Sequence, residues 1–119
     1  MTRLENHLEK ARELKETAER ASGPAAQVEL WFLAAYHLIE ACAAKQRLHI
    51  QKHQRVPEEL RANPGIFGKE TPRVVEAFRY LDHEARAKFV YGSTGTKSDF
   101  ARARASFETI EAICEEILR

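Results

Sequence analysis

Residues 86–99, RAKFVYGSTGTKSD, bring together several side chains that can handle phosphate. Arg86 supplies a guanidinium, Tyr91 follows five residues later, and Lys88 and Lys97 supply two ammonium groups. An arginine fork binds phosphate through two hydrogen bonds and stabilises negative charge that develops in a transition state. Arg86 is therefore the first candidate for phosphate contact, with Tyr91 as its neighbour.

Within this stretch, residues 92–98, GSTGTKS, differ from a P-loop. A P-loop has the pattern G-x-x-x-x-G-K-[ST] and follows a β-strand. Here the glycines lie three residues apart, and Thr96 separates Gly95 from Lys97. A helix N-terminus with a nearby lysine can still hold a phosphate. We favour the simpler interpretation, a bend at residues 92–97 whose glycines permit positive φ angles.

A second group of basic side chains occupies residues 45–55. Clustered cations can follow a nucleic-acid backbone, so Arg47 and His53 are further binding candidates. Glu58 and Glu59 follow directly and confine the positive charge, which makes a solvated loop the alternative interpretation. The full group is Lys45, Arg47, His49, Lys52, His53 and Arg55.

Two histidine spacings raise the question of a metal site. His49 and His53 lie four residues apart and would share a helix face, but no third ligand stands at a useful spacing. His37 and Glu40 lie three apart, in the reverse of the Glu-x-x-His order of bundle metal sites, and there is no second copy. We expect a hydrogen bond between His37 and Glu40 instead, and we predict neither a metal nor a cofactor.

The composition indicates one globular domain that spans residues 1–119. The chain is 44% hydrophobic and 31% charged, which suffices for one core, and its net charge of +1 gives no global attraction to nucleic acid or membrane. Cys42 and Cys114 stand in apolar helical patterns, so we expect two core thiols in a reducing compartment. The N-terminus is charged, and the apolar run at residues 28–39 is far shorter than the roughly 20 residues of a membrane span. A cytoplasmic protein without a signal peptide or membrane helix is expected.

Apolar periodicity predicts four long helices and one short one. The first spans residues 2–21, and the second and most apolar spans 24–47, with Pro24 in its first turn. The second helix carries one narrow polar strip, formed by Glu29, Tyr36, His37 and Glu40.

The short helix is predicted at residues 57–61, amid prolines and glycines. The next helix starts with Thr71 as N-cap and Pro72 at its first position, and the last starts with Ser98 as N-cap. No stretch alternates with period two, so the expected fold is an all-α, up-and-down helical bundle. The last helix has an apolar seam formed by Phe100, Ala103, Phe107, Ile110, Cys114 and Ile117.

The order of these features resembles the HEPN domain family (higher eukaryotes and prokaryotes nucleotide-binding). A central helix with AAYHLIEA is followed by HIQKHQRVPEEL, by a helix ending LDHEARAKFVYG and by an amphipathic last helix. The chain looks most like a small prokaryotic branch, in which Arg, four residues and Tyr-Gly precede the last helix, as Arg86, AKFV and Tyr91-Gly92 do here. The resemblance covers about residues 24–119 and includes AYH at 35–37 and His53, near the short Ser-His element of that branch.

The resemblance implies a function in RNA or nucleotide binding. HEPN ribonucleases use Arg, four to six residues and His, usually beside the partner's copy in a homodimer, for metal-independent RNA cleavage. Arg86 matches the arginine, but Tyr91 stands at the histidine position, and a phenol with a pKa near ~10 is a poor general base at neutral pH. The resemblance therefore implies a homodimer that binds RNA or a nucleotide through Arg86, Lys88 and Lys97, without the catalytic histidine.

The resemblance also implies a partner, a minimal nucleotidyltransferase of the kind found in the family's toxin–antitoxin pairs. Arg47 and His53 also satisfy the bare spacing of the ribonuclease motif, but they follow the central helix instead of preceding the last one. Two alternatives stay open. In one, the chain is a protein-interaction module in which Arg86 is structural. In the other, it is an active endoribonuclease in which another histidine, such as His83, replaces the missing one.

Overall fold

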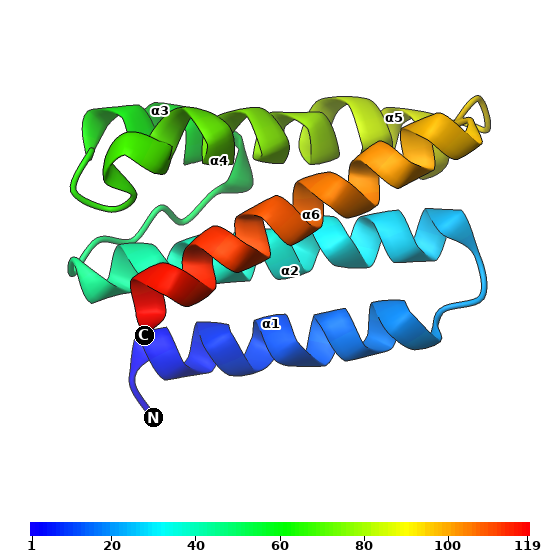
Figure 1. Cartoon of the computed structure of the whole chain (residues 1–119). Helices are drawn as coiled ribbons and strands as arrows, with labels where there is room; N and C mark the ends of the chain where they lie inside the picture. Colours follow the sequence, from blue (N-terminus) through cyan, green and yellow to red (C-terminus); the bar gives the residue numbers. More distant parts are fainter.

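The structure, a computed structural model, describes residues 1–119 and contains helices and no strands, which confirms the all-α prediction. The first two helices form an antiparallel hairpin, and the last helix crosses the second one diagonally (Figure 1). The shorter elements lie on the far side of the last helix from the first helix (Figure 1). The elements are α1 (Arg3–Arg20), α2 (Pro24–Lys45), η1 (His53–Arg55), α3 (Val56–Ala62), η2 (Gly68–Glu70), α4 (Thr71–Arg79), η3 (Tyr80–Ala85), α5 (Arg86–Phe89) and α6 (Lys97–Leu118).

The first helix, predicted at residues 2–21, spans Arg3–Arg20 and has Thr2 as its N-cap. The Thr2 hydroxyl caps α1 by accepting a hydrogen bond from the Glu5 amide, and the Glu5 carboxylate accepts a hydrogen bond from the Thr2 amide. This reciprocal capping box satisfies two amides that no helical carbonyl can reach. Pro24 stands in the first turn of α2, where its missing N–H costs nothing.

The central helix α2 ends at Lys45, two residues earlier than predicted. Arg47 adopts a positive φ of 61°, which a right-handed helix cannot contain. The amides of Gln46, Arg47 and Leu48 bond back to the carbonyls of Ala43 and Ala44 and close the end. His49 therefore lies on a loop and His53 begins the 3-10 turn η1, so the two histidines do not share an α-helix face.

A continuous helical rod runs from Thr71 to Phe89, but its middle part, η3, is a π-helix that the sequence pattern did not predict. The predicted N-cap at Thr71 is wrong. The 3-10 turn η2 leads directly into α4, so Glu70 stands at the N-cap and the Thr71 hydroxyl donates to the Gly68 carbonyl. The short helix α3 exceeds its predicted bounds by one residue at each end.

The last helix α6 starts two residues before the predicted position, because Thr96 and not Ser98 is its N-cap. Thr96 accepts from the Asp99 amide, and the Asp99 carboxylate accepts from the Thr96 amide. The predicted seam of α6 faces the core, where Phe107 and Phe100 pack against Trp31 of α2. Cys42 and Cys114 are free thiols that are buried in the same core, as predicted.

None of the helices combines the length and the apolar character that a membrane span requires. The buried side chains form one cluster to which α1, α2, α4, η3 and α6 all contribute. Glu40 is the one charged side chain among the buried residues, with an exposed fraction of 1%. A buried carboxylate must be compensated, and its partners are described below.

Candidate functional site

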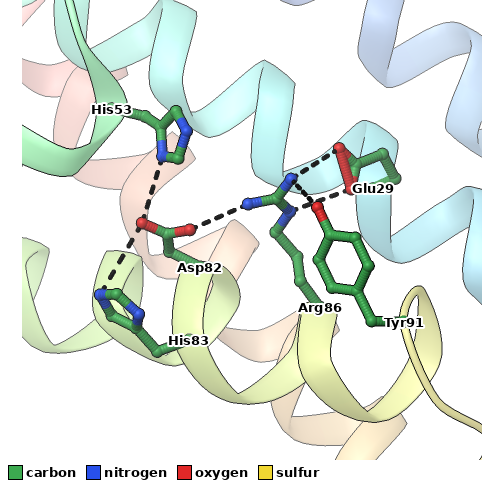
Figure 2. Close-up of polar contacts among 6 residues, drawn as sticks. All are labelled: Glu29, His53, Asp82, His83, Arg86 and Tyr91. Carbon is green, nitrogen blue, oxygen red and sulfur yellow. Dashed lines mark hydrogen bonds and ion pairs between the residues drawn. The ribbon is translucent and has the colours of Figure 1, made fainter.

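Arg86 lies at the start of α5, and its guanidinium is held between two carboxylates (Figure 2). Its Nε donates to Glu29 Oε2 at 3.0 Å and its Nη2 to Glu29 Oε1 at 3.3 Å, while its Nη1 donates to Asp82 Oδ1 at 3.0 Å. The guanidinium carbon also lies 4.1 Å from the centre of the Phe32 ring. The side chain is 13% exposed. Arg86 thus joins the central helix to the rod that precedes α6.

The electrostatics of this arrangement limit what Arg86 can bind. Burial alone would lower the pKa of Arg86, but the hydrogen bonds and charges of Glu29 and Asp82 raise it, so the guanidinium is permanently charged. Two carboxylates face one cation, which leaves little attraction for a further anion. The phosphate contact that the sequence predicts for Arg86 would have to compete with both.

Tyr91 is the neighbour of Arg86, as the sequence predicts. Its hydroxyl accepts from Arg86 Nη2 at 2.9 Å, and the Arg86 carbonyl accepts from the Tyr91 amide at 3.0 Å. The tyrosine is nevertheless 74% exposed, and it is the one strongly exposed aromatic residue of the chain. Its ring is available to a planar partner such as a nucleobase.

Two histidines complete the cluster around Asp82. His53 Nδ1 lies 3.3 Å from Asp82 Oδ2, and His83 Nε2 lies 3.9 Å from the same oxygen (Figure 2). The Asp82 side chain is only 7% exposed, whereas those of His53 and His83 are 33% and 66% exposed. Asp82 therefore orients His53, which is the role that a carboxylate plays beside a general base.

We call Glu29, His53, Asp82, His83, Arg86 and Tyr91 the Arg86 cluster. Asp82 and His83 belong to the π-helix η3, which ends directly before Arg86. π-Helical turns inside α-helices occur frequently at functional sites. The resemblance pointed to Arg86, Tyr91 and His53, and His83 was the histidine considered as a replacement for the missing one; the structure brings all four together.

The other predicted binding residues lie apart from the Arg86 cluster. Lys88 Nζ donates to Asp99 Oδ1 at 3.1 Å and so ties α5 to the start of α6. Lys97 is exposed on the first turn of α6. Arg47 is exposed on the loop after α2, and no contact joins it to His53, which bonds Asp82 instead. The spacing match between Arg47 and His53 therefore does not correspond to a pair in space.

An arginine-lined cleft of about 720 Å³ adjoins the Arg86 cluster. It shares His83 with the cluster but does not include Arg86 or Tyr91. Arg102 of α6 stacks on Tyr80 at its wall, with the guanidinium carbon 4.1 Å from the ring centre. Its charged side chains are Arg61, Arg79, Arg102, Glu76 and Glu84. Sequence reasoning missed this cleft, because its arginines come from three separate segments.

A second polar cluster surrounds Glu40, at the other end of α2. The carboxylate accepts from the Ile50 amide at 2.9 Å and from the Tyr36 hydroxyl at 3.2 Å, and His49 Nε2 lies 3.3 Å away. The predicted bond between His37 and Glu40 is wrong: His37 Nδ1 lies 2.9 Å from His7 Nδ1 of α1. The helix hairpin brings these two rings together.

The metal-ligating side chains of this second cluster converge. One ligand atom from each of His7, Glu40 and His49 lies within 4.8 Å of the other two. The sequence offered His49 and His53 as a pair, but His53 turns to Asp82. His7 was missed because 42 residues separate it from His49 in the chain.

The chain was also compared with models of protein families, with curated proteins and with solved structures, and none of them matches it. Its function must therefore be argued from its own side chains.

Proposed function

We propose that this chain is a HEPN-like helical protein that binds RNA or a nucleotide at the face formed by the Arg86 cluster and the arginine-lined cleft. One observation supports this most directly: Arg86, Tyr91 and His53, which the family resemblance connects with the site, lie together with His83 in one cluster that opens to solvent through Tyr91. The motif residues Arg86 and Tyr91 thus lie in the same cluster as a histidine that comes from a distant segment.

The roles within this site follow from charge and exposure. Arg86 is compensated by Glu29 and Asp82, so it positions Tyr91 and Asp82 and leaves phosphate contact to other residues. Tyr91 stacks on a base, since its ring is exposed and its hydroxyl is anchored. Phosphates lie in the cleft, where the three arginines outnumber the two glutamates.

The proposal has finer parts with two different bases. A homodimer and a minimal nucleotidyltransferase as the partner of a toxin–antitoxin pair rest on the resemblance. An up-and-down arrangement of four long helices and a location in the cytoplasm rest on the sequence pattern. In a homodimer of the kind that the resemblance implies, Tyr91 of each protomer would lie beside the partner's copy of the site. Light scattering of the purified chain tests the dimer, and co-purification with a small nucleotidyltransferase encoded by a neighbouring gene tests the partner.

Fluorescence anisotropy with a labelled single-stranded RNA tests the binding site. Tyr91→Ala removes the stacking ring from an exposed position and should weaken binding by about 1–3 kcal/mol at an unchanged melting temperature. The double variant Arg79→Ala/Arg102→Ala should reduce the magnitude of the slope of log K against log salt concentration by about 1.4, because each phosphate contact on a single strand contributes about 0.7. Arg119→Ala is the matched control, since Arg119 is exposed and pairs only with Glu116. Binding that is unaffected in both test variants would contradict the proposal.

Cleavage of the same RNA in EDTA distinguishes binding from catalysis. His53 is held by Asp82, as a general base is held by a carboxylate, and His83 is its exposed neighbour. Cleavage that disappears in His53→Ala or His83→Ala, with RNA binding retained, would make the chain a metal-independent endoribonuclease. Binding without cleavage is the result expected if Tyr91 has replaced the catalytic histidine.

A protein-interaction module is the second candidate function. It is favoured by the two carboxylates around Arg86, which give the arginine a structural role. In that case RNA would bind weakly and equally to the wild type, Tyr91→Ala and Arg79→Ala with Arg102→Ala. The anisotropy experiment therefore separates the two candidates.

A further inference from the structure

The cluster around Glu40 contains more ligand chemistry than a buried carboxylate needs. Its oxygens already accept from the Ile50 amide and the Tyr36 hydroxyl, so the carboxylate is satisfied without a histidine. Three histidines nevertheless gather there: His49 contacts Glu40, His7 lies beside both, and His37 contacts His7. They come from α1, α2 and the loop after α2.

We propose that His7, Glu40 and His49 bind a divalent transition-metal ion, with Zn²⁺ as the expected metal. Two imidazoles and one carboxylate form a donor set that zinc takes in proteins, with the fourth position left to water. This inference is independent of the proposed RNA-binding function, because it concerns the opposite end of α2.

The distance between Glu40 and His49 agrees with a tetrahedral ion. Donors about 2.0–2.1 Å from a zinc ion at tetrahedral angles lie roughly 3.3 Å from each other. Glu40 Oε2 and His49 Nε2 are 3.3 Å apart, and His7 completes a triangle whose longest side is within 4.8 Å. His49 is 42% exposed, so its side chain has room to adjust its position as a ligand.

The surrounding hydrogen bonds resemble those that orient metal ligands. The contact between His7 Nδ1 and His37 Nδ1 leaves Nε2 of His7 available as a ligand atom. The Ile50 amide and the Tyr36 hydroxyl fix the Glu40 carboxylate, which leaves it little freedom to turn away. The ligands are therefore positioned by a second layer of contacts, as in established metal sites.

A bound ion would stabilise the loop after α2, which has an unfavourable backbone conformation. Arg47 and Gln51 hold positive φ angles of 61° and 73°, which side chains other than glycine and asparagine rarely adopt. His49 stands between them and is the loop's own ligand. A bound ion would tie this loop to both helices of the hairpin and stabilise the folded chain.

The experiment uses the full chain without an affinity tag, stripped with EDTA and dialysed. Native mass spectrometry and calorimetric titration with Zn²⁺ should give one ion per chain, and Zn²⁺ should raise the melting temperature while Mg²⁺ should not. Co²⁺ should give the intense visible bands of a tetrahedral complex. His49→Ala, a change at an exposed position, should weaken Zn²⁺ binding at least tenfold and abolish the thermal shift.

His53→Ala is the matched control, because His53 has a similar exposure, lies four residues from His49 and bonds Asp82. It should bind Zn²⁺ as tightly as the wild type. The inference is overturned if Zn²⁺ does not bind, if His49→Ala and His7→Ala bind it as well as the wild type does, or if His53→Ala loses it. RNA binding by His49→Ala separately shows whether the other face still functions.

Discussion

Truncation of Arg86 is the sharpest test of how the structure is held together. Arg86→Ala would leave Asp82, whose side chain is 7% exposed, and Glu29, which is 30% exposed, without their cation. Removing one partner of a buried ion pair costs roughly 3–5 kcal/mol. Glu29 can be rehydrated, and His53 and His83 remain beside Asp82, so the expected loss is about 1 kcal/mol smaller than this range, about 2–4 kcal/mol.

The loss can be converted into a melting temperature. At roughly 2.1 cal/mol/K per residue, a chain of this length has an unfolding entropy of about 0.25 kcal/mol/K, so each kcal/mol corresponds to about 4 °C. Arg86→Ala should therefore melt about 8–16 °C below the wild type, measured by circular dichroism at 222 nm. Arg73→Ala is the control, since Arg73 pairs with Glu70 on the surface at 62% exposure, and such pairs contribute about 0–1 kcal/mol.

A second substitution separates the loss of the cation from the loss of packing. Asp82→Asn in the Arg86→Ala background removes the orphaned charge and should restore part of the melting temperature. A decrease of less than about 3 °C in Arg86→Ala would refute the reasoning, because it would mean that the two carboxylates do not depend on Arg86. A large decrease that Asp82→Asn does not relieve would assign the effect to the lost stacking on Phe32 instead.

Three further predictions concern α6 and the bend before it. Phe107→Ala should cost about 3–5 kcal/mol in chemical denaturation, because the ring is 3% exposed, and a negligible loss would contradict the assigned face of α6. Hydrogen bonds from the Thr96 amide, Lys88 and the Thr96 hydroxyl hold the pKa of Asp99 below its ordinary value. The ionised carboxylate therefore stabilises the fold above about pH 4, the ordinary pKa of an aspartate. This contribution is lost as the pH falls through the lowered pKa. The stability difference between the wild type and Asp99→Asn should therefore shrink between about pH 5 and pH 2 in urea titrations, and a constant difference would argue against the cap. Gly95→Ala should destabilise by roughly 1–3 kcal/mol, because an added Cβ would clash with the Phe89 ring; an unchanged urea midpoint would mean that the ring moves aside freely.

The sequence predicts the helices well because their apolar spacing is a local signal. It places the ends less well, since several hydroxyl residues compete for each cap. At TGTKSD, Thr96 and Ser98 both stand before the helix, and the decisive feature is Asp99 three residues after Thr96, which completes a capping box. That pattern was present in the sequence. The π-helical turn of η3 was not, because its sequence, YLDHEA, carries no apolar spacing that distinguishes it from an ordinary helix.

The Arg86 cluster shows the same division between local and distant signals. Asp82 stands four residues before Arg86, a helical spacing at which ion pairs form, so this partner could have been predicted. Glu29 lies 57 residues away and His53 reaches Asp82 from 29 residues away, and only the packing of the rod against α2 brings them together. The expectation that Arg86 faces a phosphate came from its type and motif, and neither carries information on its distant partners.

The polar strip of α2 connects these observations. Glu29 and Glu40 are eleven residues apart, which is three helical turns and about 16 Å along the axis, so both project from nearly the same side of the helix. A helix this apolar can carry carboxylates on a packed side only where hydrogen-bond donors are brought to them. Arg86 supplies them to Glu29, while Tyr36, His49 and the Ile50 amide supply them to Glu40. The two clusters are far enough apart for substitutions in one to leave the other intact, and the RNA and zinc experiments therefore test independent properties of the chain.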